Sequence, residues 1–170
     1  DGGYFLPENV LKHSSHLISC GIGSNNDFEI ALARQGFHGI QIDNSISKAP
    51  ILHHNLTFLK TTLGRDKNSK SIEDIIEQFP GVKNFVLKLD IEGSEYSVLE
   101  DLDMSFFQAI IIEFHFLHLI SEDTFWNRIQ KILLSLNETH SLLYINPNNY
   151  SGFSIIGGVP IPITVEVLYV

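Results

Sequence analysis

Short apolar runs alternate along this chain with stretches whose apolar residues recur at helical spacing, and this alternation narrows the possible folds most. A strand, a helix and a second strand normally build a parallel sheet, because the helix carries the chain back across one face. The run from Ile110 to Ile112 fits a strand that is covered on both faces. The expected strands are 17–20, 38–43, 56–60, 85–89, 109–114, 142–145 and 163–169.

Four helices are expected between these strands. Asn26, with Glu29 three residues later, has the pattern of a capping box, and Gly36 would end that helix. Ser71 with Asp74 would begin the second helix. The other two are expected over 94–102 and from Asp123 onward, with Phe125, Ile129, Ile132, Leu133 and Leu136 on the buried face of the last.

The end of the chain departs from the alternation. Glycines and prolines interrupt residues 146–162, and no helix is expected there. Without a crossover helix, the last two strands pair most easily in antiparallel fashion. We therefore predict an α/β, Rossmann-like sheet of seven strands with the last strand antiparallel and helices on both faces. No repeat or change of composition divides the chain, so we expect residues 1–170 to form a single domain.

Charge and cysteine content exclude several function classes. The chain has 11 Lys and Arg against 20 Asp and Glu, a formal charge of −9, and no basic block that would grip nucleic acid. Its single cysteine, Cys20, excludes an internal disulfide and a thiolate zinc cluster. No apolar run approaches the ~20 residues that span a bilayer. We expect a cytoplasmic protein with neither nucleic-acid nor membrane partners, and leave its oligomeric state open.

Candidate ligand-binding residues follow the predicted strands, since an open α/β sheet binds ligands beyond the carboxyl ends of its strands. Gly21 and Gly23 follow the first strand, and Asp43 follows the second. Glycines allow a sharp turn before a helix, and a carboxylate at this place can accept the hydroxyls of a ribose. The pattern favours an adenosine-bearing cofactor. The alternative is a tight turn with a solvated aspartate.

Acidic residues gather after the fourth and fifth predicted strands. Asp90 and Glu92 follow residues 85–89, and Glu113 and His115 end the next strand. Residues two apart on a strand share a face, so Lys88 and Asp90 should converge with Glu113 and His115 if the two strands are neighbours. In the alternative interpretation, Lys88 and Glu113 neutralise each other as a buried ion pair without a chemical role.

The segment LKLDIEGSEYSVLEDL (87–102) resembles the DIEG-type segment of the FkbM-family methyltransferases, which are class I enzymes that use S-adenosylmethionine. The similarity spans nearly the whole chain. It implies the class I methyltransferase sheet of seven strands with the last one antiparallel. The other matching segments are DGGYFLP (1–7), ISCGIGSNNDFEIALARQG (18–36), Asp43, IIEFHF (111–116) and IPITVEV (161–167).

The resemblance also implies contacts with the cofactor. Gly21 and Gly23 would approach the methionine part of S-adenosylmethionine, and Asp43 would hold the ribose. Asp90 would lie near the amino acid moiety and the transferred methyl group.

Two residues depart from the family pattern. Ser19 stands where an acidic residue usually precedes the glycine turn, and Asn25 stands where a third glycine is usual. Asp90 or Glu92 would then carry the charge that the acidic residue normally supplies. The expected cofactor-binding residues are Gly21, Gly23, Asn25, Asp43, Asp90 and Glu92.

Methylation of a hydroxyl group requires a base, and we expect the acceptor to be a small molecule or a glycan. His115 is our first candidate, because its ordinary pKa lies near neutrality, and Asp90 is the second. With Glu113 they form the expected catalytic set; His115 could instead be a core histidine bonded to a backbone carbonyl. These side chains and Glu92 have the chemistry of Mg²⁺ or Mn²⁺ ligands, but a cofactor cleft explains them without a metal, and we expect none.

Two other functions remain open at this stage. A nicotinamide-dependent oxidoreductase shares the order of strand, glycines, helix and acid, although GIGSNN (21–26) lacks the three-glycine pattern of that class. A non-catalytic module could bind the adenosine cofactor with the same fold. The acceptor pocket is expected from loops 44–55, 64–70 and 146–160, whose composition does not identify an acceptor.

Overall fold

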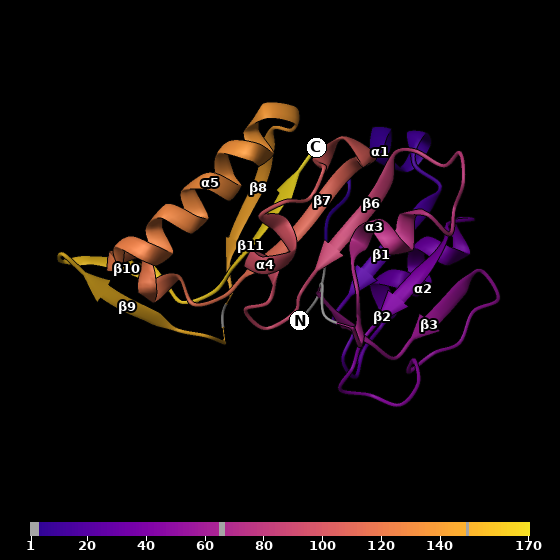
Figure 1. Cartoon of the computed structure of the whole chain (residues 1–170), viewed down its shortest axis with the longest axis horizontal. Helices are drawn as coiled ribbons and strands as arrows, with labels where there is room; N and C mark the ends of the chain where they lie inside the picture. The colour runs from indigo at the N-terminus through magenta and orange to yellow at the C-terminus, as the bar shows by residue number, and fades with distance from the viewer. Residues whose placement is uncertain (1–3, 65–66, 149) are drawn as a thin grey trace.

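A seven-stranded sheet forms the centre of the protein in the computed structural model, which describes residues 4–64, 67–148 and 150–170 (Figure 1). Parts of segment 1–7 and of loops 64–70 and 146–160 thus lie outside the described residues. The strands stand in the order β3-β2-β1-β6-β7-β11-β8. Their bounds are β1 His16–Cys20, β2 His38–Ile42, β3 Leu56–Leu59, β6 Phe85–Leu89, β7 Phe107–Phe114, β8 Leu142–Pro147 and β11 Val165–Tyr169.

The direction of the strands confirms the predicted sheet. β3, β2, β1, β6 and β7 pair in parallel, whereas β11 pairs antiparallel with both β7 and β8. The last strand of the sequence is therefore inserted between β7 and β8. β8 consequently points the same way as β7, although no parallel pairing joins the two.

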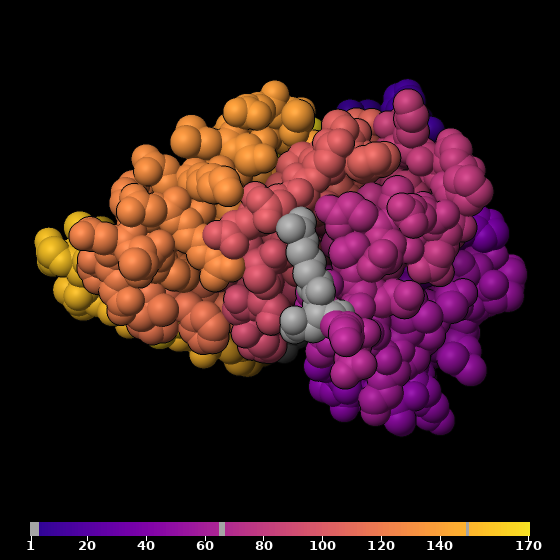
Figure 2. Space-filling view, in the orientation of Figure 1, coloured from indigo at the N-terminus to yellow at the C-terminus, as the bar shows by residue number. Residues whose placement is uncertain are grey.

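Helices cover both faces of this sheet, as predicted. α3, α4 and α5 share one hydrophobic core with the strands, and α1 and α2 share a second core on the opposite face. Ile110 and Ile112 belong to the first core and Ile111 to the second, which explains the apolar triplet. α5 covers the left part of the near surface in the space-filling view, where its atoms are orange (Figure 2). The helices are α1 Glu8–His13, α2 Asp27–Arg34, α3 Ile72–Ile76, α4 Glu95–Leu99 and α5 Asp123–Thr139, with 3₁₀ turns η1 Met104–Phe106 and η2 Leu117–Ser121.

The structure adds short elements that the sequence analysis missed. α1 is one of them, and β4 Thr62–Leu63 pairs with β5 Ser69–Lys70. β9 Phe153–Ile156 and β10 Val159–Pro162 form a hairpin around Gly157 and Gly158. A Gly-Gly pair between apolar residues is a hairpin signal, so the sequence did hold this information.

Two of the four predicted helix starts, at Ser71 and at Asn26, differ in outcome. Ser71 and Asp74 form the complete capping box, with each side chain bonded to the other residue's backbone N–H. The capping box expected at Asn26 and Glu29 is wrong. The side chain of Asn26 instead bonds the backbone of Ile51 in both directions, at 2.8 and 3.0 Å, and so ties loop 44–55 to the start of α2.

No helix in the described part of the chain is both long and apolar enough to cross a bilayer.

The packing of α5 predicts unequal effects for two leucines on the same helix. Leu136 is 0% exposed and Leu134 is 60% exposed. Leu136→Ala should lower the free energy of unfolding by ~2–5 kcal/mol, because it leaves a cavity against the sheet. Leu134→Ala should change it by no more than ~0.5 kcal/mol. Urea denaturation of both variants measures the difference, and equal losses would contradict this orientation of α5.

Candidate functional site

The carboxyl ends of β1, β2 and β6 meet at Gly21. Its N–H donates to Ile42 O at 2.8 Å, and the N–H of Asp90 donates to Cys20 O at 3.0 Å. A Cβ atom at Gly21 would lie 1.6 Å from the carbonyl oxygen of Asp90, and φ is +78° there. Only glycine fits this turn, because any side chain would collide with the backbone after β6.

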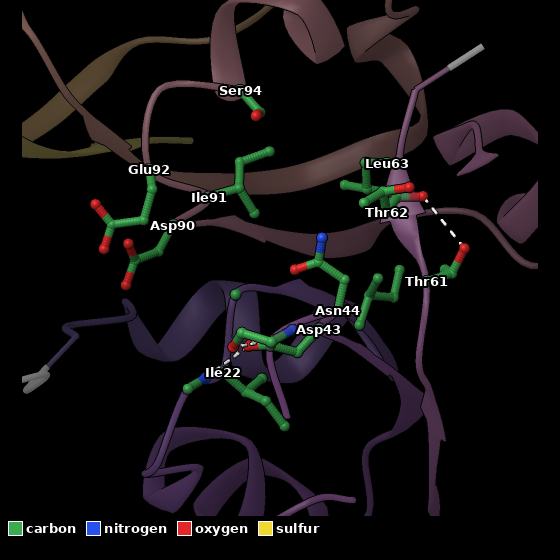
Figure 3. A pocket seen from close by; sticks show the side chains of 14 residues that line it. Ile22, Asp43, Asn44, Thr61, Thr62, Leu63, Asp90, Ile91, Glu92 and Ser94 are labelled. Atoms are coloured by element: carbon green, nitrogen blue, oxygen red, sulfur yellow. Dashed lines mark hydrogen bonds between the residues drawn. The ribbon is translucent and has the colours of Figure 1, made fainter. Parts of the chain in front are cut away.

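A pocket of about 310 Å³ opens at this meeting point (Figure 3). Asp90 and Glu92 lie together at one end, and Thr61, Thr62 and Leu63 lie at the other. Five of the six predicted cofactor-binding residues line it: Gly21, Gly23, Asp43, Asp90 and Glu92.

Asp43 is held as a buried carboxylate beside the glycine turn. Oδ2 accepts the N–H of Gly23 at 2.8 Å, and Oδ1 accepts the N–H and the hydroxyl of Ser45 at 2.7 and 2.6 Å. Burial by itself would raise the pKa of Asp43, but these hydrogen bonds outweigh it and lower the pKa below its ordinary value. Asp43 is therefore ionised at neutral pH.

Lys88 lies beneath the glycine turn with its ammonium group almost fully buried. Nζ donates to Gly21 O at 2.9 Å and lies 3.9 Å from both Glu29 Oε1 and Asp90 Oδ2. No ion pair links Lys88 to Glu113 among the described residues, so the predicted structural pair of these two is not formed. The ring of Tyr4 covers the ammonium group, with 5.1 Å from Nζ to the ring centroid.

Ser19 has a charged partner of its own. Its hydroxyl donates to Glu29 Oε1 at 2.6 Å, so a carboxylate from α2 lies next to the position where the family usually has an acidic residue. Asn25, at the third glycine position, is not in the left-handed region. Its side chain accepts the N–H of Asp27 at 2.8 Å and so supports the first turn of α2.

Glu95 holds the turn after β6 against the end of β7. Its carboxylate is 0% exposed and accepts the N–H of Gly93 at 2.8 Å and the N–H of His115 at 2.8 Å. His115 Nδ1 also lies 3.2 Å from Glu95 Oε1, and the hydroxyl of Tyr96 donates to His115 O. The imidazole is thereby fixed in orientation by a buried carboxylate.

Two residues near Glu95, one after β6 and one after β7, have a strained backbone. Glu92 and Phe116 have φ values of +54° and +60°, which non-glycine residues adopt rarely. Gly93, which follows Glu92, packs so closely on Phe116 that a Cβ atom at Gly93 would lie 2.2 Å from the ring. The Glu92 side chain is 86% exposed, and its Oε2 lies 3.4 Å from His115 Nε2. The turn thus directs one exposed carboxylate toward the imidazole.

Two groups at the end of β7 have raised pKa values. Burial and the neighbouring Asp90 carboxylate raise the pKa of Glu113 to about 7, despite the amide of Asn148, which donates to Oε1 at 2.6 Å. Burial would lower the pKa of His115, but its hydrogen bond to Glu95 and the surrounding carboxylates raise it to about 9. At neutral pH His115 therefore carries a positive charge, and Glu113 is close to half-protonated.

A second pocket of about 330 Å³ lies on the other side of the glycine turn and shares Gly21, Ile22 and Asp90 with the first. The predicted residues Asn25, Asp90 and Glu113 line it, whereas His115 lines neither of the two pockets. Its remaining walls come from Tyr4, Ser24, Asp27, Phe28, Glu29, Lys88, Asn148 and Glu166.

Asp90, Glu113 and His115 also have the chemistry of metal ligands, and their ligand atoms lie within 4.8 Å of one another. Binding a metal there would require His115 to lose a proton that its surroundings stabilise. The ammonium group of Lys88 already supplies positive charge to Asp90. We therefore treat the three side chains as a proton-binding cluster.

Sequence reasoning missed several side chains of this site. Thr61 and Thr62 follow β3 after Lys60, so the rule applied to the other strands would have found them. Glu29 and Glu95 are brought here by the packing of α2 and α4, and Tyr4 reaches Lys88 from the segment before α1.

Comparison with known proteins identifies the family to which this site belongs. A family model described as the methyltransferase FkbM domain matches residues 5–144. The chain belongs to this family. The match includes the glycine turn, Asp43 and the acidic residues Asp90, Glu92 and Glu113 of the FkbM domain.

Two curated proteins are similar to part of this FkbM domain: "Probable methyltransferase-like protein 24" of Homo sapiens and of Rattus norvegicus. Each is 28% identical over 116 residues, which cover 60% of this chain and 32% of the relative. The match thus spans about a third of these relatives' length. A solved precorrin-6y C5,15-methyltransferase from Geobacter metallireducens aligns over 95% of this chain and 85% of its own, with 8% identity and a TM-score of 0.45.

The contact at Gly21 predicts different costs for two neighbouring glycines. Gly23 also has a positive φ, +52°, but nothing lies within 4 Å of its Cβ position. Gly23→Ala should cost ~1–2 kcal/mol of unfolding free energy, the penalty of a left-handed alanine. Gly21→Ala should cost a further ~1–3 kcal/mol, because its methyl group displaces the backbone at Asp90. Urea denaturation separates the two, and equal losses would refute the close approach.

The raised pKa of Glu113 predicts a pH-dependent stability. The folded state binds this proton more tightly than the unfolded chain, so the stabilisation is complete below about pH 4.5 and lost as pH rises through about 7. The neutral glutamine of Glu113→Gln does not titrate, so this variant does not lose that stabilisation as pH rises. The free energy of unfolding of the variant minus that of wild type should therefore increase from pH 5 to pH 8. Urea denaturation across this range measures it, with the exposed Glu138→Gln as control. A difference that does not vary with pH would contradict the raised pKa.

Proposed function

We propose that this FkbM domain is an S-adenosylmethionine-dependent methyltransferase that methylates a hydroxyl group of a small molecule or glycan. The observation that supports it is the pocket where the bare backbone of Gly21 and the carboxylate of Asp43 lie side by side. Family membership supports the reaction class, and this pocket supports the kind of cofactor.

The residues present fit a nucleoside with a charged tail. Asp43 accepts hydrogen bonds from Gly23 and Ser45, and the backbone of Ile46 also stabilises its charge. Its carboxylate lines the first pocket, where a ribose hydroxyl would approach it. The backbone of the turn leaves space above Gly23, where no atom lies within 4 Å of the Cβ position. S-adenosylmethionine bound here would supply an activated methyl group on a positively charged sulfur.

The second pocket is our candidate for the acceptor side. Asp90 belongs to both pockets, so a ligand that fills the first would present its far end to the second across Gly21 and Ile22. Its wall of carboxylates, hydroxyls and amides suits a polar acceptor. Orientation of the acceptor hydroxyl toward the methyl group should supply much of the rate.

Glu113 is the better-placed base for that hydroxyl. It lines the second pocket, and a pKa of about 7 allows it to accept a proton near neutral pH and release it after turnover. His115, our first candidate from the sequence, is protonated below about pH 9 and lines neither pocket. We assign His115 to charge stabilisation beside Glu113, and Asp90 to the boundary between cofactor and acceptor.

Calorimetric titration tests the cofactor part of the proposal. Wild type should bind S-adenosylhomocysteine and show no binding of NAD. Asp43→Asn should weaken S-adenosylhomocysteine by ~10-fold or more, because it removes the charge from the ribose hydrogen bond. Glu138→Gln, on the exposed face of α5, should bind as wild type does. Binding of NAD alone would overturn the cofactor assignment.

Methyl transfer tests the catalytic part. Radiolabelled S-adenosylmethionine and a panel of hydroxylated small molecules and glycans should give a labelled product with wild type. Glu113→Gln should lower the turnover rate by ~10²-fold or more while cofactor affinity stays unchanged. Cofactor binding without transfer to any acceptor would instead favour a non-catalytic cofactor-binding module.

A further inference from the structure

Glu29 places an unpaired carboxylate oxygen in the wall of the second pocket. Its side chain is 2% exposed, and its Oε1 accepts the Ser19 hydroxyl at 2.6 Å and lies 3.9 Å from Lys88 Nζ. Among the described residues, Oε2 makes no hydrogen bond. It is not fully shielded from solvent either. A carboxylate this deeply buried leaves its second oxygen open only toward the pocket.

The protein satisfies the Glu29 carboxylate only in part. The Ser19 hydroxyl donates to Oε1 at 2.6 Å. The ammonium group of Lys88 lies 3.9 Å from Oε1, but it donates to Gly21 O rather than to Glu29. The carboxylate therefore retains hydrogen-bonding capacity for a further donor.

The remaining walls of the pocket favour a cation as the missing partner. Asp27, Asp90, Glu113 and Glu166 add carboxylates, and Lys88 is the one lysine or arginine among the described lining residues. Glu113 and Glu166 lie directly opposite each other in the β7–β11 register, where like charges destabilise a sheet. A single buried oxygen in a pocket wall suits a compact nitrogen donor such as a primary ammonium group.

We infer that Glu29 binds the α-ammonium group at the amino-acid end of the cofactor. This inference rests on the proposed function, because a nucleoside held at Asp43 would carry its amino-acid tail across Gly21 to the part of the second pocket that Glu29 lines, which leaves the part lined by Glu113 for the acceptor. Glu29 is then the ionic contact of the tail, and Ser19 orients it through Oε1. Neither Asp90 nor Glu92, which the sequence analysis expected in this role, is needed for it.

Calorimetric titration with two ligands tests the contact. The first is S-adenosylhomocysteine, and the second is its desamino analogue, in which hydrogen replaces the ammonium group. Wild type should bind S-adenosylhomocysteine ~10-fold or more tightly than the analogue. Glu29→Gln should lose ~10-fold in affinity for S-adenosylhomocysteine and nothing for the analogue, so that the preference disappears. Glu138→Gln should keep the wild-type preference.

The outcomes separate this inference from the proposed function. Wild type that binds neither ligand would refute the proposed function itself. Wild type that binds both equally, or Glu29→Gln that weakens both equally, would overturn the role of Glu29 while the cofactor assignment stands. If Glu29→Gln does not fold, as judged by circular dichroism, Glu29→Asp keeps the charge one methylene farther back. It should then reduce the preference for S-adenosylhomocysteine, and an unchanged preference would overturn the inference.

Discussion

The buried ammonium group of Lys88 is the interaction on which the site depends. It donates to the carbonyl of Gly21 and lies 3.9 Å from the carboxylates of Glu29 and Asp90, so one charge joins β1, α2 and the turn after β6. Carboxylates buried to this extent are costly without a partner. Removing one member of such a cluster leaves the others uncompensated, and is therefore more harmful than replacing the whole set with apolar groups.

A second buried charge holds the other half of the site. Glu95 joins the backbone N–H groups of Gly93 and His115, and these bonds keep Glu92 and Phe116 in their rarely adopted conformations. Strain of this kind persists only where the surroundings impose it, and it is concentrated at functional sites. Glu95 thus positions His115 and the turn that carries Glu92.

Much of the fold could be predicted from local patterns. The alternation of strands and helices, the triple Ile110–Ile112 and the missing crossover helix before β11 were sufficient for a seven-stranded sheet with a reversed last strand. The helix start at Ser71 was predicted because its partner Asp74 lies only three residues later. The same reasoning failed at Asn26, because tertiary partners in loop 44–55 and at Ser19 compete for its side chain and for that of Glu29.

The residues of the candidate site also fall into a group that local patterns predict and a group that only tertiary packing brings together. Gly21, Gly23, Asp43 and Asp90 follow their strands directly, and the parallel sheet is sufficient to bring such residues to one edge. The sequence by itself thus determined the sheet, the glycine turn and which acids line the first pocket. Only the tertiary structure decided that Glu29 lies beside Ser19, that Glu95 fixes His115, and that burial gives Glu113 rather than His115 a pKa near neutrality. The reason is physical: the alternation of strands and helices follows from local periodicity, whereas protonation and side-chain pairing depend on which charged groups are buried together.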